Sequence, residues 1–77
     1  MVRVDIRTLM RIDNLIRKEA TGSPSSLGKR LGLSERAAYN YLKFMKEELN
    51  APIEFSKVKG SYRYASKGQF NFKWKLN

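Results

Sequence analysis

Residues 28–42, GKRLGLSERAAYNYL, join the end of one helical pattern to the start of another. Leu27 and Leu31 lie four residues apart, so they share one face of a helix expected over residues 24–31. Gly32 comes next, and a glycine at that position can take the left-handed conformation that ends a helix. The sequence therefore predicts a helix that stops at Gly32 and a turn of about three residues after it.

The helix after this turn is expected over residues 35–49, with Ser34 as its N-cap. At about 100° per residue, its apolar and polar residues separate onto two faces. The apolar face collects Ala38, Tyr41, Leu42, Met45 and Leu49. The polar face collects Arg36, Asn40, Lys43 and Glu47, with Tyr39 at its edge. The pattern indicates an amphipathic helix with one buried side.

A further helix is expected ahead of this pair, over residues 8–20. Its apolar residues recur at helical spacing, and they are Leu9, Ile12, Leu15, Ile16 and Ala20. Either Asp5 or Thr8 can cap its start. Ser23 and Pro24 then suit the N-cap and the first position of the helix over residues 24–31.

Two extended patterns follow the helices. Alternation over residues 53–65 predicts a β-hairpin, either with a two-residue turn that sets Phe55 opposite Tyr64 or with a longer loop. Strict alternation over residues 69–76 predicts one C-terminal strand. Its apolar side would carry Phe70, Phe72, Trp74 and Leu76.

Composition narrows the classes of function. The 77 residues suffice for one domain, residues 1–77, and they contain no Cys or His, so disulfides, thiol catalysis and Cys/His zinc sites are excluded. The carboxylates are scattered and no phosphate-binding glycine loop is present, so we expect neither an enzyme nor a cofactor. No segment resembles a signal peptide or a membrane span, so we expect a cytoplasmic protein that does not bind membranes. The net charge of +9 indicates a polyanionic partner, and by charge alone this is either nucleic acid or an anionic membrane surface.

The order helix, helix, helix, hairpin predicts an α+β fold, mainly α: a winged helix-turn-helix with a C-terminal strand. A helix fits the major groove of double-stranded DNA, where Arg pairs with guanine and Asn with adenine. The helix over residues 35–49 would enter that groove, and the hairpin over residues 53–65 would lie along the backbone. The candidate nucleic-acid-binding residues are Ser34, Arg36, Tyr39, Asn40, Lys43, Lys57, Lys59 and Arg63.

The chain resembles the winged helix-turn-helix domains at the N-termini of many bacterial regulators, such as WYL-domain regulators and biotin-repressor-like modules. The resemblance is carried by residues 11–16, 27–36, 39–42, 51–53 and 60–64. It implies DNA binding and a role in transcription regulation. Members of the family often have Ala at the position of Gly28, Thr or Ser at the position of Ala37, and Arg at the position of Asn40. No effector-binding domain is present in the sequence, so no small-molecule switch is expected.

Other functions fit parts of the same sequence. The C-terminal strand and Phe44 could form a docking patch, which would make the chain a protein–protein adaptor. The aromatic residues of that strand alternate with lysines, a pattern that also suits single-stranded DNA or RNA. The same strand could pair with its copy in a homodimer, which would set two recognition helices about one DNA turn apart.

Overall fold

The fold is α+β and mainly helical, with three helices followed by a two-stranded antiparallel hairpin. The structure is a computed structural model, and it describes residues 4–71 and 73–76. The helices are α1 (Ile6–Arg17), α2 (Pro24–Leu31) and α3 (Glu35–Glu48). The strands are β1 (Ile53–Ser56), β2 (Ser61–Tyr64), β3 (Gly68–Asn71) and β4 (Lys73–Leu76).

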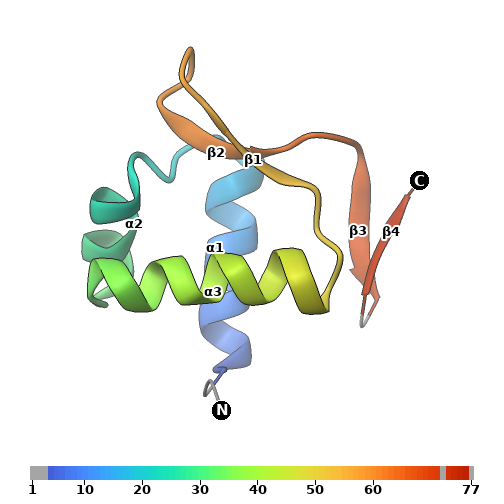
Figure 1. The fold of residues 1–77 in the computed structure, drawn as a ribbon, viewed down its shortest axis with the longest axis horizontal. Helices are drawn as coiled ribbons and strands as arrows, with labels where there is room; N and C mark the ends of the chain where they lie inside the picture. The colour runs from blue at the N-terminus through green and yellow to red at the C-terminus, as the bar shows by residue number, and fades with distance from the viewer. Residues whose placement is uncertain (1–3, 72, 77) are drawn as a thin grey trace.

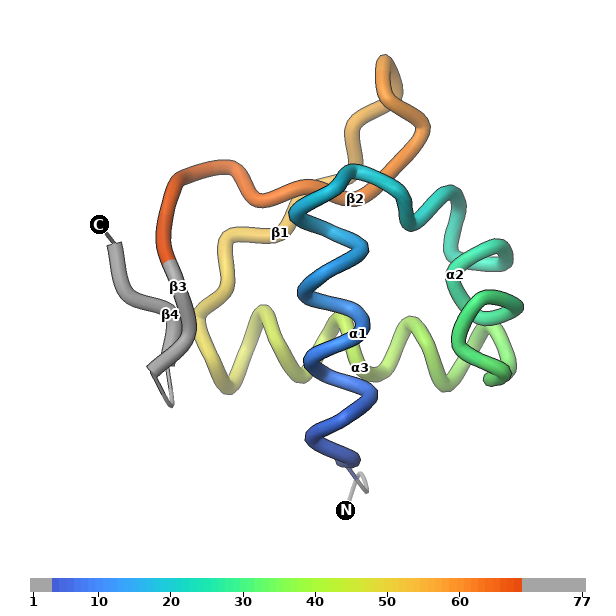
Figure 2. The backbone as a smooth tube through the Cα atoms, turned by 180° about the vertical axis from the view of Figure 1, so that it is seen from behind, coloured from blue at the N-terminus to red at the C-terminus, as the bar shows by residue number. Residues whose placement is uncertain are grey.

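The molecule is a flat slab, with Cα extents of 33 × 31 × 17 Å. Helices α1 and α3 cross each other: α3 lies in front in Figure 1, and α1 lies in front when the slab is seen from behind in Figure 2. The loop between β1 and β2 projects beyond the helices at the top of both views. Consequently α1 and α3 present their outer sides on opposite broad faces of the slab.

The core lies where the three helices meet the hairpin. Its buried side chains are Ile12, Ile16, Leu27, Leu31, Ala38, Tyr41, Leu42, Met45, Ala51 and Ile53. The expected inward faces are confirmed at these positions, whereas Leu9, Leu15 and Leu49 are only partly buried against the core and Ala20 lies beyond the end of α1. Removing this apolar surface from water is the main favourable contribution to folding.

Each helix begins at a side-chain cap. Ser23 Oγ accepts a hydrogen bond from the Ser26 N–H, and Pro24 occupies the first turn of α2 as predicted. Asp5 accepts from the Arg7 N–H at 2.8 Å, which selects Asp5 over Thr8 as the cap of α1. The expected range of 8–20 for this helix is wrong at both ends. The helix starts two residues earlier than expected, at Ile6, because of this cap. It stops at Arg17, and two residues later Glu19 takes a positive φ of 52°.

The turn between α2 and α3 is built on two glycines. Gly32 ends α2 in the left-handed region, at φ 71°, as the sequence predicts. Gly28 packs against the turn, since a Cβ there would lie 2.9 Å from the carbonyl oxygen of Leu33. Only a glycine lets the backbone approach this closely without a shift.

The β1–β2 hairpin has the longer of the two loops considered. Strand β1 pairs with β2 so that Phe55 lies opposite Tyr62 and Ile53 opposite Tyr64, which leaves residues 57–60 as the loop. The alternative with Phe55 opposite Tyr64 is therefore wrong by two residues. The aromatic residues still share one face, and the Phe55 and Tyr62 rings meet edge to face at 5.1 Å.

The C-terminal segment is a second hairpin. The prediction of one strand over residues 69–76 is wrong, because β3 and β4 pair with each other as a two-stranded antiparallel sheet. Such pairing gives the backbone N–H and C=O groups hydrogen-bond partners within the chain. The expected aromatic row of Phe70, Phe72, Trp74 and Leu76 lies outside the part whose side chains are described.

Candidate nucleic-acid interface

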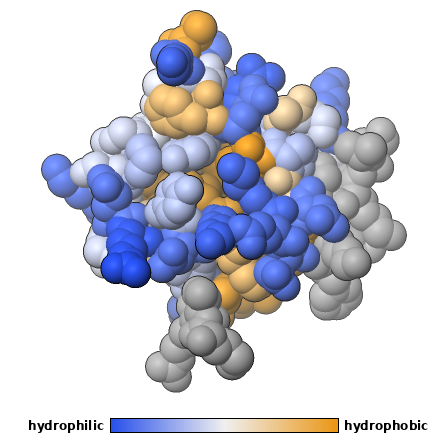
Figure 3. Space-filling view, viewed as in Figure 1, coloured by the Kyte–Doolittle hydropathy of each residue, from blue (hydrophilic) through white to orange (hydrophobic). Residues whose placement is uncertain are grey.

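The exposed side of α3 carries half of the predicted contact residues. Arg36, Tyr39 and Lys43 are exposed, and Asn40 is half-buried on the same helix. Figure 3, seen from the same side as Figure 1, shows hydrophilic side chains along α3. Because Ala38, Leu42 and Met45 anchor the other side in the core, these polar side chains have a fixed direction. The structure therefore brings four of the eight predicted residues onto one helix face.

Ser34 lies at the N-terminus of α3 and has a structural role there. Its Oγ accepts a hydrogen bond from the Ala37 N–H at 3.1 Å, which satisfies one of the free donors of the first turn. The residue is exposed, so its hydroxyl and the N-terminal end of the helix both face solvent. Partial positive charge at a helix N-terminus favours an anion such as phosphate.

The β1–β2 loop places two lysines away from the body. Lys57 and Lys59 are exposed, and the loop is held by two hydrogen bonds to Ser56. Ser56 O accepts from the Gly60 N–H at 2.8 Å, and Ser56 Oγ accepts from the Lys59 N–H at 3.2 Å. Apolar surface also appears at this tip in Figure 3, where Val58 is exposed.

Arg63 differs from the other hairpin cations. It lies in β2, away from the loop, and its Nε is 3.5 Å from Glu54 Oε2 on the paired strand. Both side chains are about half exposed, so the ion pair itself contributes little to stability. The pair nevertheless neutralises part of the charge that Arg63 would offer to a phosphate.

A hollow of about 200 Å³ separates α3 from β2. Tyr39 and Lys43 border it together with Lys46 and Tyr62, two residues absent from the predicted set. Lys46 follows Lys43 by three residues, so helical spacing was the signal that could have identified it. Tyr62 could be assigned to the hollow only once the hairpin register was known. Burial, with smaller contributions from the neighbouring Tyr39 and Glu35, raises the pKa of the Tyr62 phenol, so this hydroxyl keeps its proton.

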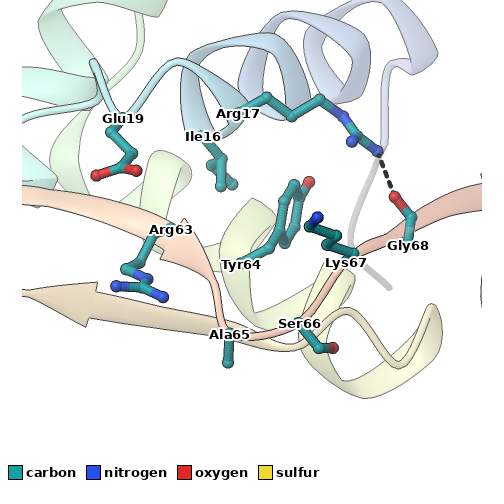
Figure 4. A pocket seen from close by; sticks show the side chains of 9 residues that line it. All are labelled: Ile16, Arg17, Glu19, Arg63, Tyr64, Ala65, Ser66, Lys67 and Gly68. Carbon is teal, nitrogen blue, oxygen red and sulfur yellow. Dashed lines mark hydrogen bonds between the residues drawn. The ribbon is translucent and has the colours of Figure 1, made fainter. Parts of the chain in front are cut away.

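Helix α1 holds strand β2 through a polar clamp. The Tyr64 hydroxyl donates to Asp13 at 2.6 Å, and Asp13 also pairs with Arg17 at 3.0 Å. The Arg17 guanidinium lies 5.4 Å from the centre of the Tyr64 ring and donates to the Gly68 carbonyl (Figure 4). These contacts fix the hairpin on the helices, and with it the position of the Lys57–Lys59 loop.

Two further hollows lie outside α3's exposed face. One, of about 540 Å³, lies beside the clamp and is lined by Arg17, Arg63 and Lys67 with Glu19 (Figure 4). The other, of about 440 Å³, lies between α1 and α3. Its lining is mainly apolar and consists of Ile6, Leu9, Met10, Asp13, Phe44, Met45 and Leu49.

Positive charge is spread unevenly over the fold. Helix α3 holds three basic and three acidic side chains, so it is electrically neutral as a whole. Residues 4–31 carry six Lys and Arg against three Asp and Glu. Residues 51–68 carry four against one. Within residues 4–68, the net positive charge therefore lies in the segment of α1 and α2 and in the hairpin segment, and not in α3.

Neither a metal-binding group of side chains nor a membrane-spanning helix is found in the described part of the chain. Across residues 4–71 and 73–76, no group of three acidic, Cys or His side chains is placed to hold a metal ion. In the same residues, no helix combines the length and apolar character needed to cross a bilayer.

Comparison with known proteins gives no relative. No family model matches the chain, and neither the curated proteins nor the solved structures contain a match.

Proposed function

We infer that the chain is a winged helix-turn-helix domain that binds double-stranded DNA. The observation that carries this proposal is the pairing of a core-anchored α3, whose outer face bears Arg36, Asn40 and Lys43, with a projecting loop that bears Lys57 and Lys59. A helix presented in this way can enter a major groove, while a basic loop beside it contacts the backbone.

The proposed division of labour follows from the chemistry of each side chain. Arg36 and Asn40 face the bases, since each can make two parallel hydrogen bonds to a purine edge. Lys43 and the two loop lysines contact phosphates, which position the protein without reading sequence. Ser34 and Tyr39 offer hydroxyls at the rim of the same face. Among the proposed DNA-contacting residues Arg63 is the least supported, because Glu54 already pairs with it.

The neutral charge of α3 is compatible with this role. Two of its three carboxylates, Glu47 and Glu48, lie at the C-terminal end, away from Arg36 and Asn40. The hairpin supplies the phosphate attraction that the helix lacks. This kind of binding suits a role in transcription regulation. Pairing of two copies through the C-terminal segment would place two recognition helices on one DNA site.

The test is binding of the purified protein to a fluorescent duplex and to the matching single strand, measured by anisotropy at two salt concentrations. Duplex binding should weaken steeply with salt, because each neutralised phosphate releases counterions. Preference for the single strand would assign binding to the aromatic C-terminal segment. Binding to neither nucleic acid at low salt would contradict the proposal and favour the protein–protein adaptor.

A further inference from the structure

The outer side of α1 carries an uninterrupted row of polar and basic side chains. Arg7, Arg11, Asn14 and Lys18 follow one another at intervals of four, three and four residues, so they fall within one narrow sector of the helix. Ile12 and Ile16 are buried on the opposite side. Arg7, Arg11 and Lys18 are all exposed.

Helix α2 extends this row. The Arg11 guanidinium donates to the carbonyl oxygen of Arg30 at 3.0 Å, and Arg30 is itself exposed at the end of α2. The contact brings the end of α2 next to the middle of α1. We call the four cations, Arg7, Arg11, Lys18 and Arg30, the basic ridge.

Acidic side chains near the ridge are few and partly engaged. Asp13 is held by Arg17 and Tyr64 in the clamp. Asp5 caps α1, and Glu19 follows Lys18 at the other end. No described carboxylate forms an ion pair with Arg7 or Lys18. The ridge therefore keeps a net positive charge along its length.

The ridge and the proposed DNA-reading face lie on opposite sides of the slab. Helix α3 is in front in Figure 1, whereas α1 is in front in the reverse view of Figure 2. The slab is 17 Å thick in this direction. A duplex bound on α3 would therefore leave the ridge free, and Arg7, Arg11 and Lys18, which lie opposite the buried side of α1, would face away from that duplex.

We propose that the basic ridge binds the phosphate backbone of a second duplex, so that one molecule bridges two DNA segments. This inference rests on the proposed function of α3 and deepens it. Arg7 and Lys18 are eleven positions apart, which corresponds to a rise of roughly 16 Å along the helix. That length equals the rise of about five base pairs at 3.4 Å each.

The composition of the ridge favours a nucleic acid over a membrane. Binding in a bilayer interface requires an apolar face that enters the lipid, whereas this sector of α1 carries Arg, Asn and Lys. A linear row of cations without base-reading geometry suits sequence-independent contact with phosphates.

The test compares two variants that each lower the formal charge by three. The ridge variant carries Arg7→Gln, Arg11→Gln and Lys18→Gln. The face variant carries Lys43→Gln, Lys57→Gln and Lys59→Gln. Binding to one fluorescent duplex is measured by anisotropy. Bridging is measured as capture of a second, labelled duplex by a duplex fixed on beads.

We expect the wild-type protein to capture the second duplex. The ridge variant should bind a single duplex with a Kd within about threefold of the wild-type value and lose at least tenfold in capture, because its α3 face is intact. The face variant should lose capture as well. A second ridge variant with Arg7→Gln, Lys18→Gln and Arg30→Gln keeps the Arg11 contact with α2 and should behave like the first, provided that circular dichroism shows the native helix content.

Several results would overturn the inference. A wild-type protein that binds one duplex but captures no second one would do so, as would ridge variants that capture as well as the wild type. Bridging that survives in the ridge variants would assign it to a dimer. Wild-type binding to vesicles of phosphatidylserine and phosphatidylcholine that the ridge variants lose, without any DNA capture, would assign the ridge to membranes. Absence of any duplex binding by the wild type would reject the proposed function itself, which is a distinct outcome.

Discussion

The hydroxyls of Thr21 and Ser61 lie 2.9 Å apart in the interior of the protein, with the two residues 0% and 1% exposed. The Thr21 N–H donates to Ser61 Oγ at 3.0 Å, and the Tyr62 N–H donates to Thr21 Oγ1 at 2.9 Å. These bonds join the loop between α1 and α2 to the start of β2. Both ends of β2 are therefore held by polar contacts, Ser61 by the loop between α1 and α2 and Tyr64 by Asp13 of α1.

Removing one hydroxyl from this pair should destabilise the fold. Ser61→Ala leaves the Thr21 N–H buried without an acceptor, and Thr21→Val removes the acceptor of the partly buried Tyr62 N–H. A buried donor left unsatisfied costs about 1–3 kcal/mol. Urea unfolding should show each loss, and the double variant should lose less than the sum, because both changes remove one network. A change below about 0.3 kcal/mol in both single variants would contradict this account.

Gly28→Ala should also lower the free energy of unfolding, although the winged helix-turn-helix domains that the sequence resembles often have alanine there. A Cβ at this position meets backbone atoms of Leu33 and Ser34 at 2.9–3.1 Å, and backbone cannot yield as easily as a flexible side chain. We expect a loss of about 1–3 kcal/mol, typical of overpacking. If the turn shifts freely, the higher helix propensity of alanine would instead stabilise α2 by up to about 1 kcal/mol.

Gly32→Ala serves as the matched control for that prediction. Nothing lies within 4 Å of a Cβ at Gly32, but its φ of 71° is costly for any residue with a side chain. The expected loss of about 1–2 kcal/mol is conformational and involves no clash. A second substitution that makes room near the turn should therefore leave the free energy of unfolding of the Gly32→Ala variant unchanged.

Alkaline pH should weaken the clamp at Tyr64. Burial raises the pKa of the Tyr64 phenol above its ordinary value of 10.0, and the hydrogen bond to Asp13 and the charge of that carboxylate raise it further, while Arg17 opposes them. Because the folded-state pKa is the higher one, the stabilisation is complete below pH 10 and declines as pH rises above it. Unfolding followed from pH 8 to 11 should show this decline, and Tyr64→Phe should make the curve flatter. An equal decline in both proteins would contradict the assignment.

Base-reading and phosphate-contacting residues should be separable by their effects on DNA binding. Arg36→Ala or Asn40→Ala should cost about 1–3 kcal/mol on a preferred duplex and relax the preference at one position. Lys57→Ala and Lys59→Ala should weaken binding to all duplexes alike and reduce the salt slope by about 0.9 for each phosphate that is no longer neutralised. Competition binding on a preferred and a scrambled duplex distinguishes the two patterns. Uniform losses for Arg36 and Asn40 would reject their base-reading role.

Local chemistry made much of the fold predictable. Ser23, Pro24, Gly32 and Ser34 carry strong signals for helix ends, and the bounds of α2 follow from them directly. The end of α1 was harder, because the apolar period continues to Ala20 while the backbone has already left the helix at Glu19.

The pairing of strands could not be predicted from the sequence as well as the helix ends could. The hairpin register depends on whether the loop has two or four residues, and both choices place the aromatic residues on one face. Alternation over residues 69–76 does not distinguish one strand from two that pair with each other. The neutral total charge of α3 was available in the sequence, but the opposite faces of α1 and α3 required the structure.

The most direct test of the central claim is a titration of the ¹⁵N-labelled protein with a duplex, followed by NMR amide shifts. The account predicts large shifts at Arg36, Asn40 and the loop from Lys57 to Gly60 as binding saturates. Any shifts along α1 would report the basic ridge as a second site. Saturation of duplex binding with the α3 and loop amides unmoved would contradict the claim that this face holds the DNA.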